Sequence, residues 1–383
     1  MKKLNKIITV AVLLIFSFSC SESFLDYSPK GTLTSEVLNA PEHLDNMLTA
    51  AYASLGNDDW THAISHMWQW GSVRSDDAFK GGGSVNDQGE IDYLEQFVTM
   101  RTDLGKPNNA WIAIYEGIGR ANDALSRIDA VTEADYPQKV IREAECRFLR
   151  GHWYFLLKIL FKNPPYIDEL TPREEIKNIA NNILTNDQLW DKIAEDFQFG
   201  VDNLPEVQPE KGRANKYAAA AYLAKVRLYQ AYEQDNQNNV TNINKAKLQQ
   251  VVTLADLVIN SRKYNLSDDF AKNFLTAYEN GPESIFAIQF SYDDGTGAPG
   301  RINKATGLNY NMAPEFGCCD FHNPSQNMVN AFHTDENGLP LFDTFNEVVL
   351  RNPEDFWNNT VDPRLDHTVG IATHPLNISL PGL

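Results

Sequence analysis

The sequence predicts a mostly α-helical protein that also has long loops and a few short strands. Through much of the first two-thirds of the chain, apolar residues recur every three or four positions, which is the period of an amphipathic helix. Pro164, Pro165 and Pro205 follow such stretches, and proline ends a helix because it lacks the N–H donor and clashes with the preceding turn. Residues 284–292 instead alternate apolar and polar side chains, as a strand does.

Six stretches carry the helical pattern, and their expected bounds are 44–55, 111–128, 137–161, 185–204, 215–232 and 248–259. The fourth opens with a capping box, in which the Thr185 hydroxyl caps the first turn while Gln188 reaches back. The fifth is rich in alanine, so a neighbouring helix can approach it closely. Short linkers favour antiparallel pairs, either stacked as in tetratricopeptide repeats or gathered into a plain helical bundle.

Two long segments, 56–106 and 293–325, lack a periodic pattern and are expected to be irregular loops. The first contains three consecutive glycines at 81–83 together with Trp60, Trp68 and Trp70, and its tryptophans argue against disorder. Long loops inside compact domains are usually functional or disordered. We therefore expect these loops to form a functional face of the protein.

The N-terminus predicts export and attachment to a lipid. Three lysines, an apolar run over residues 7–16 and the small residue Ser19 precede Cys20, which is the layout of a lipoprotein signal peptide over residues 1–19. The alternative is an ordinary secreted protein that has Cys20 near its cleavage site. No other stretch of the sequence reaches the roughly 18–20 apolar residues of a membrane-spanning helix. We expect a protein held on a membrane by acylated Cys20.

Charge and cysteine content narrow the possible partners. The formal net charge of the 383 residues is −18, and it becomes −21 without residues 1–19, which hold three lysines and no acids. Such a surface repels phosphate backbones, so nucleic acid is not an expected partner.

Cys146 lies in a helical apolar pattern and is expected to be buried. Cys318 and Cys319 form either a vicinal disulfide or two thiols.

Short motifs in one consistent order reveal a family resemblance. They are Cys20–Asp26 with Pro29, Trp111 to Asn122, Glu143–Arg150 with Tyr154–Phe155, Gly212–Arg213, Tyr264–Leu266, Glu283–Phe286, Pro324–Phe332 and Asp362–Arg364. The ordered set, which spans residues 20–364, resembles the SusD/RagB family of outer-membrane lipoproteins of Bacteroidota.

The resemblance implies an architecture and a set of partners. It implies a fold of tetratricopeptide-like helix pairs with a loop-rich ligand face, made of an N-terminal helical domain over 20–232 and a RagB/SusD domain over 233–383. The family continues beyond the Asp-Pro-Arg motif with a further helical segment, so the second domain is expected to be incomplete at its C-terminus. The implied partner is a SusC-like TonB-dependent transporter, and the implied ligand is an oligosaccharide or a peptide.

Ligand contact is expected on the two loops. Sugar recognition without catalysis needs aromatic rings for the apolar face of a pyranose and planar polar groups for its hydroxyls. The candidates on both loops are Trp68, Trp70, Arg74, Asp76, Asp77, Tyr310, Asn311 and Phe316. The alternative is that the aromatic residues only fasten the loops to the helices.

Cofactor and catalytic motifs are weak in this sequence. Gly295 to Gly300 matches a dinucleotide-binding pattern, but no helical pattern follows it to supply N–H groups for a pyrophosphate. His62 and His66 have a metal-ligand spacing without a third ligand motif. A structural calcium ion held by Asp58, Asp59, Asp76 and Asp77 is the cofactor left open.

The sequence and the resemblance together predict a non-enzymatic lipoprotein of the outer-membrane surface that binds nutrient, with oligosaccharide as the expected ligand, and delivers it to a SusC-like transporter. One alternative is a RagB-like protein that binds peptide. Another is a helix-pair scaffold for an outer-membrane complex without a small ligand, and a third is a hydrolase.

Overall fold

The helical prediction is confirmed in the computed structural model, which describes residues 35–56, 67–290 and 320–371. Each of the six predicted stretches corresponds to a helix. These are α4 (Pro41–Ala53), α6 (Gly105–Asp129), α7 (Lys139–Phe161), α8 (Asn186–Asn203), α9 (Lys216–Ala231) and α10 (Lys245–Asn260). Among the described helices, none is both long enough and apolar enough to cross a bilayer.

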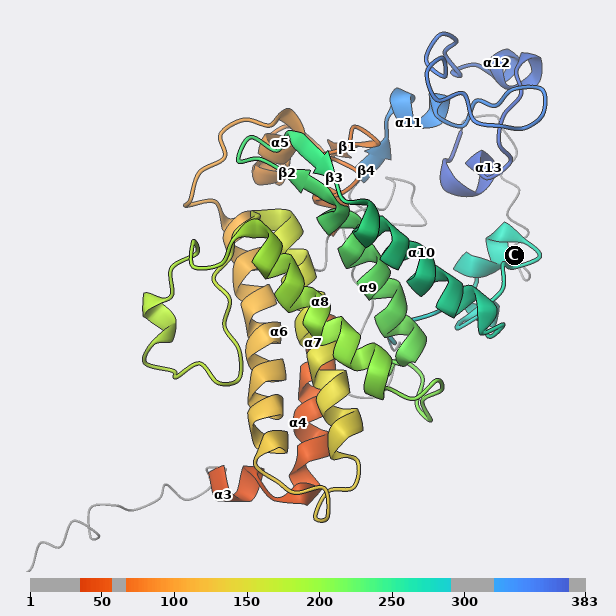
Figure 1. Ribbon diagram of the computed structural model, residues 1–383. Helices are drawn as coiled ribbons and strands as arrows, with labels where there is room; N and C mark the ends of the chain where they lie inside the picture. The colour runs from red at the N-terminus through yellow and green to blue at the C-terminus, as the bar shows by residue number, and fades with distance from the viewer. Residues whose placement is uncertain (1–34, 57–66, 291–319, 372–383) are drawn as a thin grey trace, which may run out of the picture.

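The long helices form a stack of antiparallel neighbours. From α6 to α10 each helix packs against the next one in the chain, and α4 lies against both α6 and α7 (Figure 1). This order is the stacked-pair arrangement expected from the resemblance. The stack continues through α10, beyond the domain boundary expected at 232/233, and that boundary stays a prediction.

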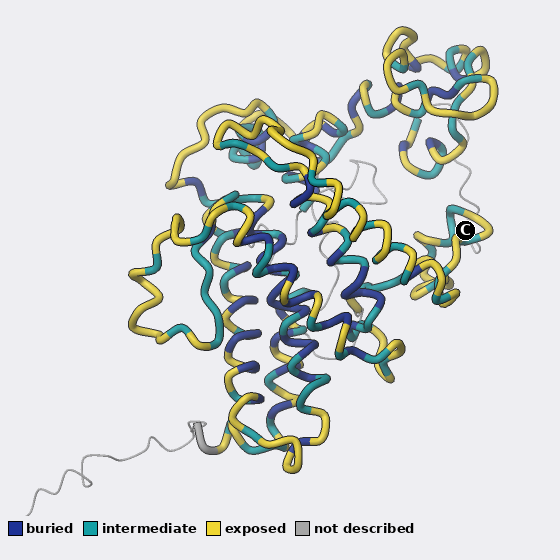
Figure 2. The backbone as a smooth tube through the Cα atoms, viewed as in Figure 1, coloured by how far each residue is buried: buried dark blue, intermediate teal, exposed yellow. Residues whose placement is uncertain are grey.

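A core rich in aromatic residues runs along the inner faces of these helices, which Figure 2 shows as dark segments. Trp153, Phe148 and Phe197 are almost completely buried. The ring of Phe197 stacks on Tyr222 with centroids 4.9 Å apart. Burial of such rings is the main source of stability, because each removes a large apolar area from water.

Glycine allows the closest approach between two of the helices. A Cβ atom on Gly117 of α6 would lie 2.3 Å from the indole of Trp153 on α7, so no larger residue fits without movement. The same holds between α8 and α9, where a Cβ on Gly200 would lie 2.9 Å from that of Ala219.

The capping box predicted at the start of α8 is confirmed. The Thr185 hydroxyl accepts a hydrogen bond from the Gln188 backbone N–H at 3.2 Å, and the Gln188 side chain accepts one from the Thr185 N–H at 2.9 Å. These bonds satisfy donors that the first helical turn leaves without a partner. Asn215 caps α9 in a similar way, through the N–H groups of Tyr217 and Ala218.

The expectation of one irregular loop over 56–106 is wrong for part of its length. It contains β1 (Ala78–Gly81), α5 (Gly89–Gln96) and the first two residues of α6. β1 pairs antiparallel with β4 (Phe321–Pro324), with Gly81 opposite Phe321. The sequence did not reveal this sheet, because each strand is only four residues long and its partner is far away in the chain.

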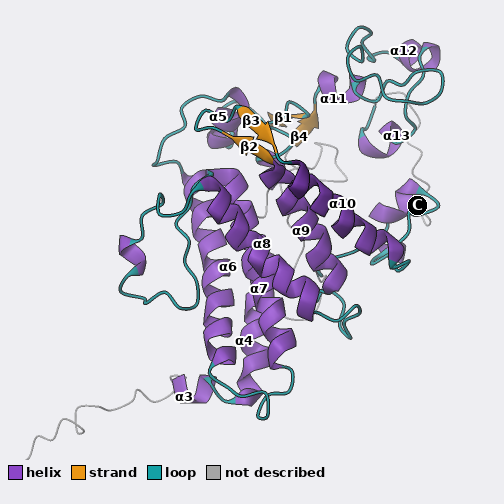
Figure 3. Cartoon of the chain, viewed as in Figure 1, coloured by secondary structure: helices purple, strands orange, loops and turns teal. Residues whose placement is uncertain are grey.

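The other short elements complete the fold. They are α3 (Ser35–Leu38), η1 (Ser54–Gly56), η3 (Ile176–Asn178), β2 (Tyr232–Gln234), β3 (Val240–Ile243), η4 (Phe270–Phe274), η5 (Thr276–Tyr278), α11 (Gln326–Asn330), α12 (Pro353–Asn358) and α13 (Leu365–Thr368). Figure 3 shows how small a share of the chain the strands occupy. Residues 325–371 form a separate lobe with a small core of Val329, Leu350, Phe356, Leu365 and Val369.

The strand expected over 284–292 is not found as part of a sheet in the described residues, which end there at 290. The segment 284–290 runs beside the helices, and Ile285 and Phe286 pack against the main core. These two residues are consecutive and Ile288 is exposed, so the alternation does not correspond to one buried face. Cys146 is buried as expected, and burial raises the pKa of its thiol.

Candidate functional site

Five of the predicted ligand residues lie in the described part of the first loop, next to the β1–β4 sheet. Trp68 is 8% exposed and stacks on His322, with ring centroids 5.0 Å apart. It belongs to a small cluster with Val73, Ile91 and Phe321. Trp68 therefore fastens the loop to β4, and ligand contact by its ring would require the ring to leave this cluster.

The neighbouring candidates are more accessible. Trp70 is half-buried, and its indole Nε1 is buried with no acceptor among the described residues. The guanidinium of Arg74 lies over the exposed ring of Phe97, 4.2 Å from its centroid, where it has a cation–π contact. Ligand contact by Trp70 and Arg74 stays a prediction.

Asp76 and Asp77 connect the loop to the C-terminal lobe through their backbones. The Ser325 hydroxyl donates to the carbonyl oxygen of Asp76, and the Ser325 N–H donates to that of Asp77 at 3.0 Å. The Asp77 carboxylate accepts a hydrogen bond from Ser75 at 2.9 Å. The Asp77 carboxylate therefore already has one hydrogen bond within the loop. Ligand contact by the two carboxylates stays a prediction.

The second set of candidates, Tyr310, Asn311 and Phe316, lies outside the described residues. The same is true of Cys20, His62, His66, Asp58, Asp59 and the Cys318–Cys319 pair. Calcium binding stays a prediction. Within the described ranges, no group of three or more His, Cys, Asp or Glu side chains is arranged to hold a metal ion.

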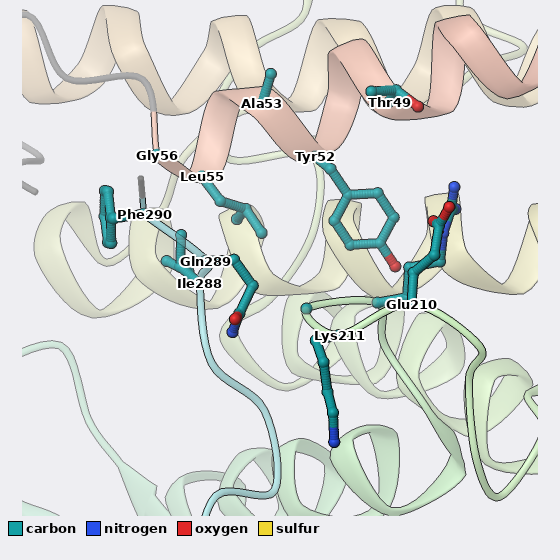
Figure 4. A pocket seen from close by; sticks show the side chains of 12 residues that line it. Thr49, Tyr52, Ala53, Leu55, Gly56, Glu210, Lys211, Ile288, Gln289 and Phe290 are labelled. Carbon is teal, nitrogen blue, oxygen red and sulfur yellow. The ribbon is translucent and has the colours of Figure 1, made fainter. Parts of the chain in front are cut away.

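A cavity of about 440 Å³ lies between the end of α4, the 210–213 loop and residues 288–290. Its apolar side consists of Leu55, Ile288 and Phe290, and its polar side includes Lys211 and Gln289 (Figure 4). Tyr52 extends from α4 toward the 210–213 loop. The volume of the cavity is in the range of small-ligand pockets, about 300–1,000 Å³.

A buried ionic network holds the wall of this cavity. The Glu145 carboxylate is fully buried and accepts hydrogen bonds from Arg142 at 2.6 Å, Arg213 at 3.1 Å and the Tyr52 hydroxyl at 2.7 Å. The Tyr52 oxygen accepts the Ala214 N–H at 2.9 Å. Burial, followed by the charge of Glu145, raises the pKa of Tyr52, so its hydroxyl stays protonated and donates.

Two further carboxylates complete the network. Asp45 accepts from Arg142 and from the Tyr136 hydroxyl, both at 2.8 Å. Glu210 pairs with Arg213 on the cavity side. Each guanidinium therefore pairs with the buried Glu145 and with a more exposed carboxylate, and Arg213 serves to position the wall more than to attract an anion.

Sequence reasoning did not bring these residues together. In the sequence, Tyr52 lies in the helical stretch 44–55, whereas Glu145 and Arg213 occur in separate family motifs. A glutamate inside an otherwise apolar helical pattern is the signal that could have shown a buried ion pair, because an unpaired buried carboxylate is costly.

Comparison with known proteins shows which family the chain belongs to. A model of SusD-like proteins, described as "Starch-binding associating with outer membrane", matches residues 23–228. A SusD-like protein of Bacteroides ovatus is 26% identical over 290 residues, which cover 75% of this chain and 50% of that protein.

Two solved structures have the same fold. One is surface glycan-binding protein A from Bacteroides thetaiotaomicron in complex with laminarihexaose, with a TM-score of 0.53 and 24% identity over 65% of this chain and 49% of that chain. The other is a laminarin-binding SusD-like protein, with a TM-score of 0.52 and 25% identity over 64% and 50% of the two chains. The chain spans about half the length of these relatives. Because the family model covers more than half of its residues, the chain belongs to the SusD-like family.

Proposed function

We propose that this protein is a glycan-binding lipoprotein of the outer-membrane surface, which holds oligosaccharide for a SusC-like TonB-dependent transporter without reacting with it. The observation that carries the proposal is the family match over residues 23–228, whose description joins starch binding to the outer membrane. The name of the laminarin-binding relative supports the same ligand class.

The structure is compatible with a binding role. A rigid helical stack carries loops with accessible side chains such as Trp70 and Arg74, and binding residues are often placed on loops that a rigid scaffold positions. Holding a ligand near a transporter raises its effective concentration there without any covalent step. Acylated Cys20 would supply that attachment.

Affinity electrophoresis in gels that contain neutral polysaccharides tests the ligand class. We expect laminarin or xyloglucan to retard the purified protein, and Trp70→Ala to reduce the retardation. Trp357→Ala is the matched control, because Trp357 is 73% exposed on α12 in the C-terminal lobe. Unchanged mobility in every polysaccharide would refute glycan binding, and retention of peptides instead would favour the RagB-like alternative.

Metabolic labelling with an alkyne fatty acid tests the anchor. The expected result is label in the outer-membrane fraction that disappears in Cys20→Ala, since only the cysteine thiol receives the first lipid. Persistent labelling of that variant would contradict the anchor.

Co-purification of a TonB-dependent barrel from detergent extracts tests the partner, and tight association without any glycan affinity would favour the scaffold alternative.

A further inference from the structure

A second, larger cavity also adjoins the 284–290 segment. It has a volume of about 1160 Å³ and is bounded by residues 270–281 and 283–290. Small-ligand pockets are typically about 300–1,000 Å³, so this groove exceeds the usual size. Its dimensions suit a chain of several linked rings more than one small molecule.

Aromatic rings line this groove. Phe270 and Phe274 of η4, Tyr278 of η5 and Phe290 all contribute to its surface. Phe274 is 71% exposed and Tyr278 is 47% exposed. The Phe270 and Phe274 rings meet edge to face with centroids 5.1 Å apart, and the Lys272 ammonium lies 5.2 Å from the centroid of Tyr278. The rings are therefore partly fixed while much of their surface faces solvent.

Planar polar groups held by hydrogen bonds also line the groove. The side-chain amides of Asn280 and Gln289 donate to each other, both at 3.0 Å, and Gln289 also donates to the Ala287 carbonyl oxygen at 2.9 Å, so Asn280 keeps one further N–H. The Glu283 carboxylate accepts hydrogen bonds from the Asn273 side chain and the Ser267 N–H, both at 2.9 Å. These bonds keep the amide and carboxylate planes in place, where their remaining sites can meet hydroxyl groups.

We propose that this groove is a carbohydrate subsite that binds a neutral oligosaccharide several sugar rings long. Exposed aromatic faces pack on the C–H faces of pyranose rings, and amide and carboxylate groups bond the hydroxyls. Glu279 and Glu283 line the groove, and the chain carries a net charge of −18, so an anionic sugar would be repelled. The inference rests on the proposed glycan-binding function and adds a second place of contact.

A peptide is the competing occupant. Within the described residues, no backbone hydrogen bond joins residues 285–290 to another strand, so an extended peptide could pair with this edge. The lining favours sugar, because amide and carboxylate side chains lie in the groove together with exposed rings, whereas a peptide-binding edge would offer mainly apolar pockets.

Isothermal titration of the purified protein with laminarihexaose and a xyloglucan oligosaccharide tests the proposal. The variant Phe274→Ala/Tyr278→Ala removes two exposed rings and should preserve the fold. We expect its affinity to fall about tenfold, which corresponds to the loss of one or two stacking contacts. Phe342→Ala is the matched control, since Phe342 is 82% exposed in a different lobe, and its affinity should stay within about twofold.

The outcomes separate this inference from the proposed function. If the unmodified protein binds glycan and the groove variant binds equally well, the groove is not a subsite and only this inference fails. If the unmodified protein binds none of the neutral oligosaccharides, the proposed function itself fails. Equal affinity for a galacturonic acid oligomer of matched length would overturn the neutral assignment. Binding of an alternating valine–threonine peptide, lost in the groove variant, would replace sugar by peptide.

Discussion

Glu145 shows how one buried side chain links segments that are distant in sequence. It is fully buried on α7, and it contacts Arg142, Arg213 from the 210–213 loop and Tyr52 from α4. A buried charge is tolerated only when it is paired, and loss of one partner leaves the other uncompensated. The stability of the cavity wall therefore depends strongly on this residue.

Glu145→Gln is expected to lower the free energy of unfolding by about 2–3 kcal/mol, because Arg142 and Arg213 would each lose a charged partner. Urea unfolding followed by circular dichroism measures the change. Glu195→Gln is the control: Glu195 is 60% exposed beside Lys192, and a surface pair contributes about 0–1 kcal/mol. Equal stability of both variants would contradict the role of the network.

His152 makes the stability depend on pH. Burial, followed by the charge of Lys225, lowers its pKa to about 4, and its Nδ1 lies 2.8 Å from the Tyr222 hydroxyl. In the unfolded chain a histidine titrates near 6.5. As the pH falls from about 6.5 to 4, the unfolded chain therefore binds a proton that the folded protein does not, and the free energy of unfolding decreases.

His152→Gln should remove this part of the pH dependence. The difference in unfolding free energy between pH 7 and pH 4.5 should shrink by about 2 kcal/mol relative to the unmodified protein. Urea titrations at both pH values give the difference. His43→Gln on α4 is the control, and a variant at position 152 with an unchanged pH profile would refute the explanation.

Among the elements, the long helices were predictable because their signals are local. Periodic apolar residues, prolines after helix ends and the Thr185 capping box each lie within a few residues of the element that they define. The β1–β4 sheet was not predictable, since Ala78–Gly81 and Phe321–Pro324 pair across most of the chain. The burial of Trp68 follows from that sheet, so its packing role could not be seen in the sequence either.

The contact between α6 and α7 should depend on Gly117. Gly117→Ala places a methyl group 2.3 Å from the buried indole of Trp153, so the helices must separate, and we expect a loss of about 1–3 kcal/mol. Gly119→Ala on the same helix is a matched control. It meets nothing within 4 Å and should gain up to about 1 kcal/mol from helix propensity. Thermal unfolding of the two variants should therefore shift in opposite directions.

At the scale of the whole molecule, the C-terminal lobe depends on a narrow connection to the helical stack. The connection includes the β1–β4 pairing, the Ser325 bonds to the first loop, the ring of Phe321 next to Trp68 and an edge-to-face contact between His367 and Phe270. The lobe has only a small core of its own. Small cores contribute little stability, so the lobe is expected to open more easily than the stack.

Phe321→Ala should loosen this connection. The ring is 3% exposed, and removing a buried phenylalanine typically costs about 3–5 kcal/mol. Limited proteolysis should cut residues 320–371 faster, while hydrogen exchange in α6 to α9 stays slow. Phe342→Ala, which removes an exposed ring from the same lobe, should leave the cleavage rate unchanged. Equal protection of both regions in the Phe321 variant would show that the lobe does not depend on this ring.

The hydrogen bonds among Tyr52, Glu145 and Arg213 also affect the smaller cavity, because they order part of its wall. Three separate segments of the chain are held to one another before any guest arrives. A surface that is ordered in advance loses little conformational entropy when a molecule lies against it. The wall that these three residues form is therefore ordered before binding, and a molecule that packs against it would not have to order it.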